Sequence, residues 1–228
     1  MSGSDVNGLT PTAAVGTDVS WATMTAPETR NERKERTRRA LLDAALRQAS
    51  ERGFAGLSLR EVAKQAGVVP TAFYRHFASM DELGVTLVEE SMRTLRTMIR
   101  EARGTPGASS DLIRASVRTL SEHVRSHEEH YWFLVRERYG GTGAVRQTIG
   151  VELRLLTSEL AVDLARFDGL RDWSTEDLRL LADLIVSAMF TTVLELLEAR
   201  PGADTEIVAA AERTLRLIFV GVPHWRST

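Results

Sequence analysis

The 228-residue sequence contains no cysteine, which excludes a disulfide framework and a thiolate metal site. No basic residue precedes Arg30 and no long apolar run opens the chain, so the pattern of a secretory signal is missing. The most apolar stretch, residues 184–194, spans only 11 uncharged residues, too few to cross a bilayer. We therefore expect a soluble cytoplasmic protein with no membrane partner.

Two other kinds of pattern are missing. No segment alternates polar and apolar residues as a half-buried strand does, whereas helical periodicity recurs along the chain. The serines and acids form neither a nucleophile elbow nor a phosphate-binding loop. We therefore expect an all-α protein that is not an enzyme and needs no cofactor.

Charge is unevenly distributed along the chain. The net charge of −2 combines +6 for residues 30–77, −3 for residues 1–29 and −5 for residues 78–228. A basic module on an acidic body indicates a polyanionic partner for the module alone. Residues 1–29, rich in small and polar residues, are predicted to be a disordered tail.

The most informative stretch is SLREVAKQAGVVPTAFYRHF, residues 58–77. Ser58 and Glu61 have the spacing of a capping box at a helix start. Gly67 lies where that short helix must stop, and Pro70 suits the first position of a second helix. Two short helices joined by a tight glycine turn are a helix-turn-helix.

The second of these helices, predicted over residues 70–77, has faces suited to DNA recognition. Phe73 and Phe77 lie four residues apart and can anchor the helix to a core. The residues left to face outward include an arginine, which can read guanine, and groups that can hold phosphates. A plain helical hairpin with a solvated basic face is the alternative.

A basic helix precedes this motif. Six basic residues between Arg30 and Arg39 lead into a helix predicted to end at Arg52, before Gly53. These charges can lie over a phosphate backbone, or they can simply be solvated.

Residues 37–83 resemble the N-terminal DNA-binding domain of the TetR family of repressors, most specifically in the segment FYRHF. The resemblance implies contacts to phosphates and bases from the following residues: Thr37, Arg38, Ser58, Arg60, Val69, Pro70, Thr71, Ala72, Tyr74, Arg75 and His76. Many family members carry a phosphate-gripping lysine just after FYRHF, where this chain has Met80 and Asp81.

The rest of the chain is helix-patterned. A long helix, predicted over residues 81–103, connects the two parts and ends at the hinge GTPGASS, residues 104–110. Further helices are predicted over 110–127, 130–139, 144–168, 175–199 and 204–220. The predicted division is a tail over 1–29, a three-helix helix-turn-helix domain over 30–79 and a helical-bundle ligand-binding and dimerisation domain over 80–228.

Residues 175–199 are apolar on most faces of the predicted helix, so this helix must be covered on two sides. With the last helix it can supply half of a four-helix seam between two identical chains. A wholly internal core helix is the alternative.

His123, His127 and His130 recur at helical spacing, and a metal site is conceivable there. The zinc-protease order is absent because Val124 follows His123. We predict no metal.

The segment YWFLVRERYGG, residues 131–141, resembles the FabR/DesT-like branch of the TetR family, which represses unsaturated-fatty-acid synthesis and binds long-chain acyl-CoA. An acyl chain needs an apolar tunnel, and arginines can hold the phosphates of CoA. The residues predicted to bind the ligand are Met92, Leu95, Met98, Phe133, Leu134, Arg136, Arg138 and Tyr139. Alternatively, the two arginines form salt bridges that tie the sensor to the DNA-binding module.

These patterns together predict a homodimeric repressor that binds a palindromic double-stranded operator. The regulated genes are predicted to be those of lipid metabolism, and the hydrophobic effector is predicted to be an acyl-CoA. The alternatives are a repressor of a drug-efflux or other gene with an unrelated hydrophobic ligand, and a helical protein-interaction module. We expect helix 81–103 to be the only element that touches both the two helices of the helix-turn-helix and the sensor, and to move as a rigid rod.

Overall fold

The computed structural model describes residues 29–103 and 109–227, and its regular elements in these ranges are all helices. Most of the predicted tail and of the predicted hinge 104–110 lie outside the described residues. The elements are α1 (Arg30–Arg52), η1 (Phe54–Gly56), α2 (Leu59–Gln65), α3 (Pro70–Phe73), α4 (Met80–Arg103), α5 (Ser109–Ser126), α6 (Glu128–Gly140), α7 (Gly143–Leu164), α8 (Thr175–Glu198), α9 (Asp204–Gly221) and η2 (Val222–His224).

Helix α1 begins and ends on local signals. Thr29 caps it: its hydroxyl accepts from the amide of Glu32 at 3.2 Å, and the Glu32 carboxylate accepts from the amide of Thr29 at 2.7 Å. Thr29 is therefore part of the folded unit and not of the predicted tail. Gly53 ends the helix with φ of +83°, a value that residues with a side chain rarely adopt.

The predicted turn between α2 and α3 is present, and Gly67 adopts φ of +71° there. The second helix is shorter than predicted, because α3 ends at Phe73 and not at Phe77. Single turns follow, in which the amides of His76 and Phe77 both donate to the carbonyl of Phe73, at 2.8 and 3.0 Å. The chain must leave the helix at this point to reach Ser79, which caps α4.

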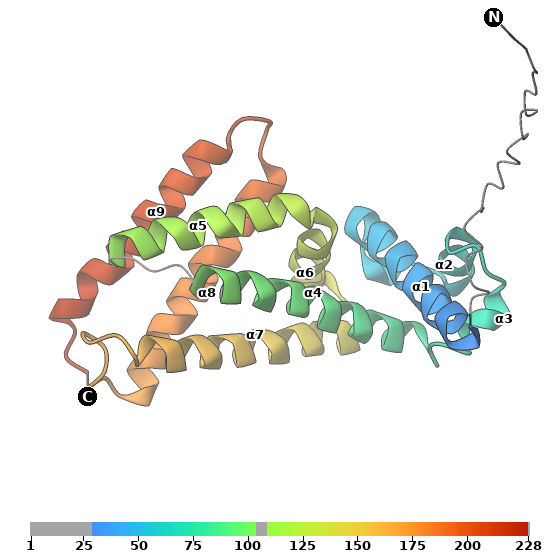
Figure 1. The fold of residues 1–228 in the computed structure, drawn as a ribbon, viewed down its shortest axis with the longest axis horizontal. Coiled ribbons are helices and arrows are strands. Elements are labelled where there is room, and N and C mark those ends of the chain that lie inside the picture. Colours follow the sequence, from blue (N-terminus) through green and yellow to red (C-terminus); the bar gives the residue numbers. More distant parts are fainter. Residues whose placement is uncertain (1–28, 104–108, 228) are drawn as a thin grey trace, which may run out of the picture.

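The molecule is elongated, with α1–α3 at one end and the C-terminus at the other (Figure 1). Helices α4 and α7 run along its length side by side, α5 covers α4, and α8 and α9 close the distal end (Figure 1). Helix α7 ends at Leu164, four residues before its predicted end, and turns replace it over residues 165–173.

The unit formed by α1–α3, predicted to bind DNA, and the body formed by α4–α9 share one apolar core. Gly84 of α4 lies at their junction, where a Cβ atom would stand 2.7 Å from the ring of Phe54 and 2.6 Å from Val145. Helix α6 packs along α1 more extensively than α4 does. Helix α6 therefore also joins this unit to the body, through α1.

Candidate DNA-binding surface and effector site

Helix α3 and the turns after it display the predicted recognition residues. Phe73 and Phe77 are buried and hold the segment to the core, as their spacing predicts. Tyr74 is 64 % exposed and Val69 65 %. The other predicted residues of this segment are exposed or half-buried, namely Pro70, Thr71, Ala72, Arg75 and His76. The surface therefore offers a hydroxyl, a guanidinium and an imidazole at one edge.

A basic pocket of about 350 Å³ joins this edge to α1. Its lining residues are Asn31, Lys34, Glu35, Arg38, Arg75 and His76. The guanidinium of Arg38 lies over the ring of Phe77, 4.7 Å from its centroid. Asn31 and Lys34 were not among the predicted contacts, although their spacing with Arg38 places all three on one helical face. The arrangement suits a phosphate, which α1 and the turns after α3 can then hold together.

His76 lies in this pocket, and its Nδ1 atom is buried without a hydrogen-bond partner. Burial lowers the pKa of His76, and the charges of Lys34 and Arg38 lower it further. An approaching phosphate would oppose these effects, because a negative charge favours the imidazolium. His76 is thus placed to gain a proton together with a phosphate contact.

Two predicted contacts already have partners within the chain. The hydroxyl of Thr37 donates to the carbonyl of Arg33 at 2.9 Å. The hydroxyl of Ser58 accepts from the amide of Glu61 and donates to its carboxylate, at 3.3 and 3.0 Å. Both hydroxyls are therefore engaged in hydrogen bonds within or at the start of a helix. Arg60, by contrast, is exposed on α2.

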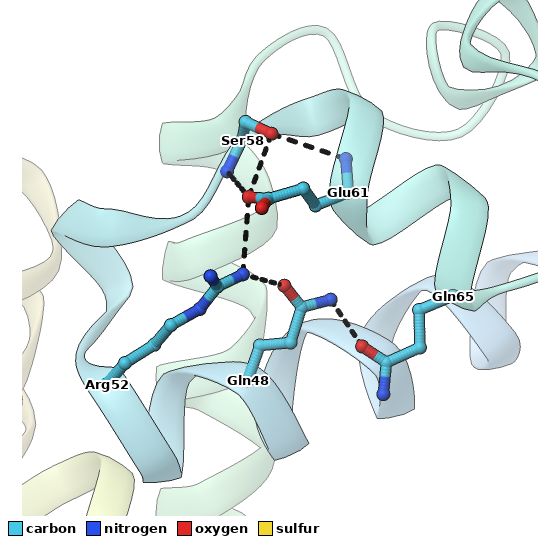
Figure 2. Close-up of polar contacts among 5 residues, drawn as sticks. All are labelled: Gln48, Arg52, Ser58, Glu61 and Gln65. Carbon is cyan, nitrogen blue, oxygen red and sulfur yellow. Dashed lines mark hydrogen bonds and ion pairs between the residues drawn. The ribbon is translucent and has the colours of Figure 1, made fainter.

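A polar network fixes α2 against α1 (Figure 2). Buried Gln48 donates to Gln65 and accepts from Arg52, both at 2.5 Å. Arg52 also donates to Glu61 at 3.2 Å, and Glu61 caps α2 together with Ser58. The N-terminus of α2 is therefore tied to the end of α1, which sets the direction in which α3 points.

The predicted effector residues divide into two groups. Five of them are buried in the main apolar core, three on α4 and two on α6: Met92, Leu95, Met98, Phe133 and Leu134. Arg136 instead donates to the carbonyl of Glu51 at 2.5 Å and lies over the ring of Trp132. Arg138 lies over the ring of Phe190, 4.5 Å from its centroid, and Tyr139 is 74 % exposed.

Arg136 does tie the body to the DNA-binding unit, as one alternative held, but through a backbone carbonyl and not a salt bridge.

A helix break at His127 separates α5 from α6, so the three histidines do not lie on one helix, although the rings of His123 and His127 stack with centroids 4.2 Å apart. His123 bonds to the hydroxyl of Tyr131 at 3.0 Å, and His130 to the hydroxyl of Ser91 at 2.9 Å. Within residues 29–103 and 109–227, no group of three or more histidines and acids is arranged to hold a metal ion. The imidazoles serve as hydrogen-bonding groups at the α4–α6 corner.

His130 should make the protein sensitive to acid. Burial lowers its pKa from 6.5 to about 4, and the charges of His127 and Arg39 contribute. The unfolded chain therefore gains the proton first, so stability present above pH 6.5 is lost as the pH falls toward 4, by up to about 3 kcal/mol. Urea unfolding of wild type and His130→Asn between pH 7 and 4 should show a smaller decline for the variant. Replacing exposed His224 in the same way should leave the wild-type decline unchanged.

Helix α8 carries more apolar surface than the single chain covers. By length and composition alone this helix could cross a membrane, yet it packs against α5, α6, α7 and α9. Only 28 % of its most apolar 18-residue window is buried within one chain. Exposed apolar side chains lie on α8 and on the adjoining α9, namely Leu180, Leu184, Leu217 and Val220. This surface is suited to packing against another protein.

Two family models match the chain in succession. Residues 41–84 match bacterial regulatory proteins of the tetR family, and residues 109–221 match the tetracyclin repressor-like C-terminal domain. Together they cover more than half of the sequence. The helix-turn-helix unit on a helical body defines a DNA-binding regulator of the one-component kind. The chain belongs to the TetR family and is a TetR-type transcriptional regulator.

Solved structures share this fold at low sequence identity. A TetR-family regulator from Streptomyces coelicolor aligns with a TM-score of 0.66 and 18 % identity, over 83 % of this chain and 97 % of that one. FadR from Bacillus subtilis, in complex with stearoyl-CoA, aligns with 0.60 and 16 %, over 80 % and 98 %. AibR, in complex with isovaleryl coenzyme A and operator DNA, aligns with 0.60 and 20 %, over 78 % and 97 %.

Proposed function

We propose that the protein is a homodimeric cytoplasmic repressor that binds a palindromic operator through α1 and α3 and regulates genes of lipid metabolism in response to a long-chain acyl-CoA. The basic pocket between α1 and the end of α3 carries the DNA-binding part of this proposal. Two such units, one on each chain, are needed to enter successive major grooves about 34–36 Å apart.

The roles of individual residues follow from their exposure and charge. Tyr74 and His76 hold phosphates, while Arg75 and Thr71 approach base edges. Lys34, Arg38 and Asn31 grip the backbone beside them, which supplies the positive charge that Met80 and Asp81 do not. Residues 30–79 form the DNA-binding domain and residues 80–228 the regulatory domain, and the apolar surface of α8 and α9 joins two chains.

The effector site is proposed at the apolar cluster between α4 and α6. Met92, Leu95 and Met98 belong to this apolar core on α4, and Phe133 and Leu134 belong to it on α6. Unbranched methionine side chains can rearrange around an acyl chain. FadR and AibR, which share the fold, were solved with acyl-CoA molecules bound, and this supports an acyl thioester as the ligand class.

Stearoyl-CoA should raise the melting temperature of the protein. A ligand at a concentration one hundred times its Kd adds about 2.7 kcal/mol to stability, or a shift of about 5–10 °C for a chain of this size. Thermal unfolding with stearoyl-CoA, stearate, free CoA and a cationic dye separates the candidates. A shift with the dye but none with stearoyl-CoA would favour a drug-responsive repressor and contradict the acyl-CoA proposal.

Met98→Trp should fill this cluster and weaken stearoyl-CoA binding, because Met98 is buried among the proposed lining residues. Titration calorimetry would give the change in Kd, and Arg118→Trp, at an exposed position on α5, is the control. Unchanged affinity in a folded Met98→Trp protein would place the ligand elsewhere.

A further inference from the structure

Two consecutive residues near the end of α6 bind the backbone at the corner between α1 and η1, residues 51–54. Arg136 donates to the carbonyl of Glu51 at 2.5 Å. Glu137 accepts, at 2.8 Å, from the amide of Phe54, the first residue of η1. Between these two backbone groups lie Arg52 and Gly53. One short piece of the body therefore satisfies a carbonyl at the end of α1 and an amide that begins the next element.

The carboxylate of Glu137 lies in an unusual environment for a charged group. The side chain is 2 % exposed, and its second oxygen is buried without a partner. Burial raises the pKa of Glu137, although the bond from Phe54 partly opposes this effect. Burying a carboxylate with only one hydrogen bond costs more free energy than burying an apolar side chain. We therefore expect a role of Glu137 beyond packing.

Glycine makes room for this carboxylate. A Cβ atom on Gly141 would lie 2.6 Å from the backbone carbonyl oxygen of Glu137 and 2.9 Å from the free carboxylate oxygen. On the other side, a Cβ atom on Gly53 would lie 3.6 Å from the bonded oxygen. The ring of Phe54 also meets the ring of Phe133 edge-on, with centroids 6.3 Å apart. The corner is thus enclosed by α6 on more than one side.

We infer that Glu137 and Arg136 are positioning residues that fix the angle between the DNA-binding unit and the body. Phe133 and Leu134, in the apolar cluster of α6, lie less than one helical turn before this pair. A shift of α6 would therefore reach α1 directly, beside any motion carried by α4. In a dimer that angle sets the separation of the two recognition segments, so the pair would determine which half-site spacing is bound.

The absence of cysteine makes this angle measurable. Nitroxide labels at Lys64→Cys on α2 and Glu122→Cys on α5, both exposed positions, report one distance between the unit and the body. Labelled chains diluted into unlabelled protein give only the distance within one chain. The measurement uses free protein, so it does not depend on the operator, the effector or dimer formation. If the proposed function is wrong, the distance still tests this inference.

Glu137→Ala should broaden the distance distribution, and hydrogen exchange of the peptide containing Phe54 should accelerate by about tenfold or more. Glu137→Gln should keep the wild-type distance distribution and the wild-type exchange rate, because its amide oxygen still accepts from the Phe54 amide. Glu129→Ala, at an exposed position on the same helix, is the matched control and should resemble wild type.

An unchanged distance distribution in Glu137→Ala, with or without faster exchange at Phe54, would overturn the inference, because the corner would then be capped without fixing the angle. If Glu137→Ala does not fold, Arg136→Ala decides, since Arg136 is exposed and its loss removes the bond to Glu51, the contact with Trp132 and a positive charge near Glu137. That variant should also broaden the distribution, and a wild-type distribution would contradict the proposed role.

Discussion

Leu184→Glu should separate the dimer into monomers and abolish binding to a full palindromic site. Leu184 is 50 % exposed in the single chain, and Leu180, one turn earlier on α8, is 51 % exposed. Across a two-fold axis each substitution occurs twice, so the dimer loses two buried leucines and gains two buried carboxylates. Losing about 2 kcal/mol per leucine, before any cost of the charges, weakens association by about a thousandfold or more.

Sedimentation equilibrium measures that effect, and Leu155→Glu on α7 is the matched control. Leu155 is 49 % exposed, almost the same as Leu184, but it lies outside the proposed seam of α8 and α9. The control should remain dimeric and bind DNA. If Leu155→Glu dissociates the protein while Leu184→Glu does not, the seam lies on α7, and the proposed dimer is wrong.

Arg75→Ala should weaken specific operator binding by about 1–3 kcal/mol and relax the preference at one base pair. The side chain is exposed at the end of the recognition segment and also borders the basic pocket. Tyr74→Ala should instead weaken binding to all sequences alike, because a phosphate contact carries no sequence information. Gel shifts on operator and random DNA separate these results.

Arg118→Ala, at an exposed position on α5 in the body, is the control for these variants and should bind like wild type. Equal losses on operator and random DNA from Arg75→Ala would assign that arginine to the phosphates.

Local signals in the sequence predicted much of the DNA-binding unit. Ser58, Gly67 and Pro70 act within a few residues of themselves, so a cap, a turn and a helix start can be recognised without tertiary information. The burial of Phe73 and Phe77 follows from their spacing for the same reason. The early end of α3 could not be predicted from local signals, because it depends on how the chain must approach α4.

The interface between the unit and the body was harder to predict. Arg136 and Glu137 bind partners 85 and 83 residues away in the sequence, and no periodicity encodes such pairings. The resemblance therefore implied that Arg136 holds a ligand phosphate, whereas in the structure Arg136 donates to the carbonyl of Glu51 near the end of α1. The buried face of α4 was predictable because its apolar residues recur at helical spacing.

The most direct test has two steps. Genomic DNA fragments that the protein binds are first selected, and the affinity of the protein for these fragments is then measured at several salt concentrations. A homodimeric repressor predicts a two-fold symmetric site, two chains per duplex, and an affinity that falls by about 10³–10⁵ between 50 and 200 mM salt for 6–10 phosphate contacts. A helical protein-interaction module predicts no enriched symmetric site and an affinity that salt leaves nearly unchanged. Monomeric binding to single half-sites, or an affinity independent of salt, would contradict the proposed function.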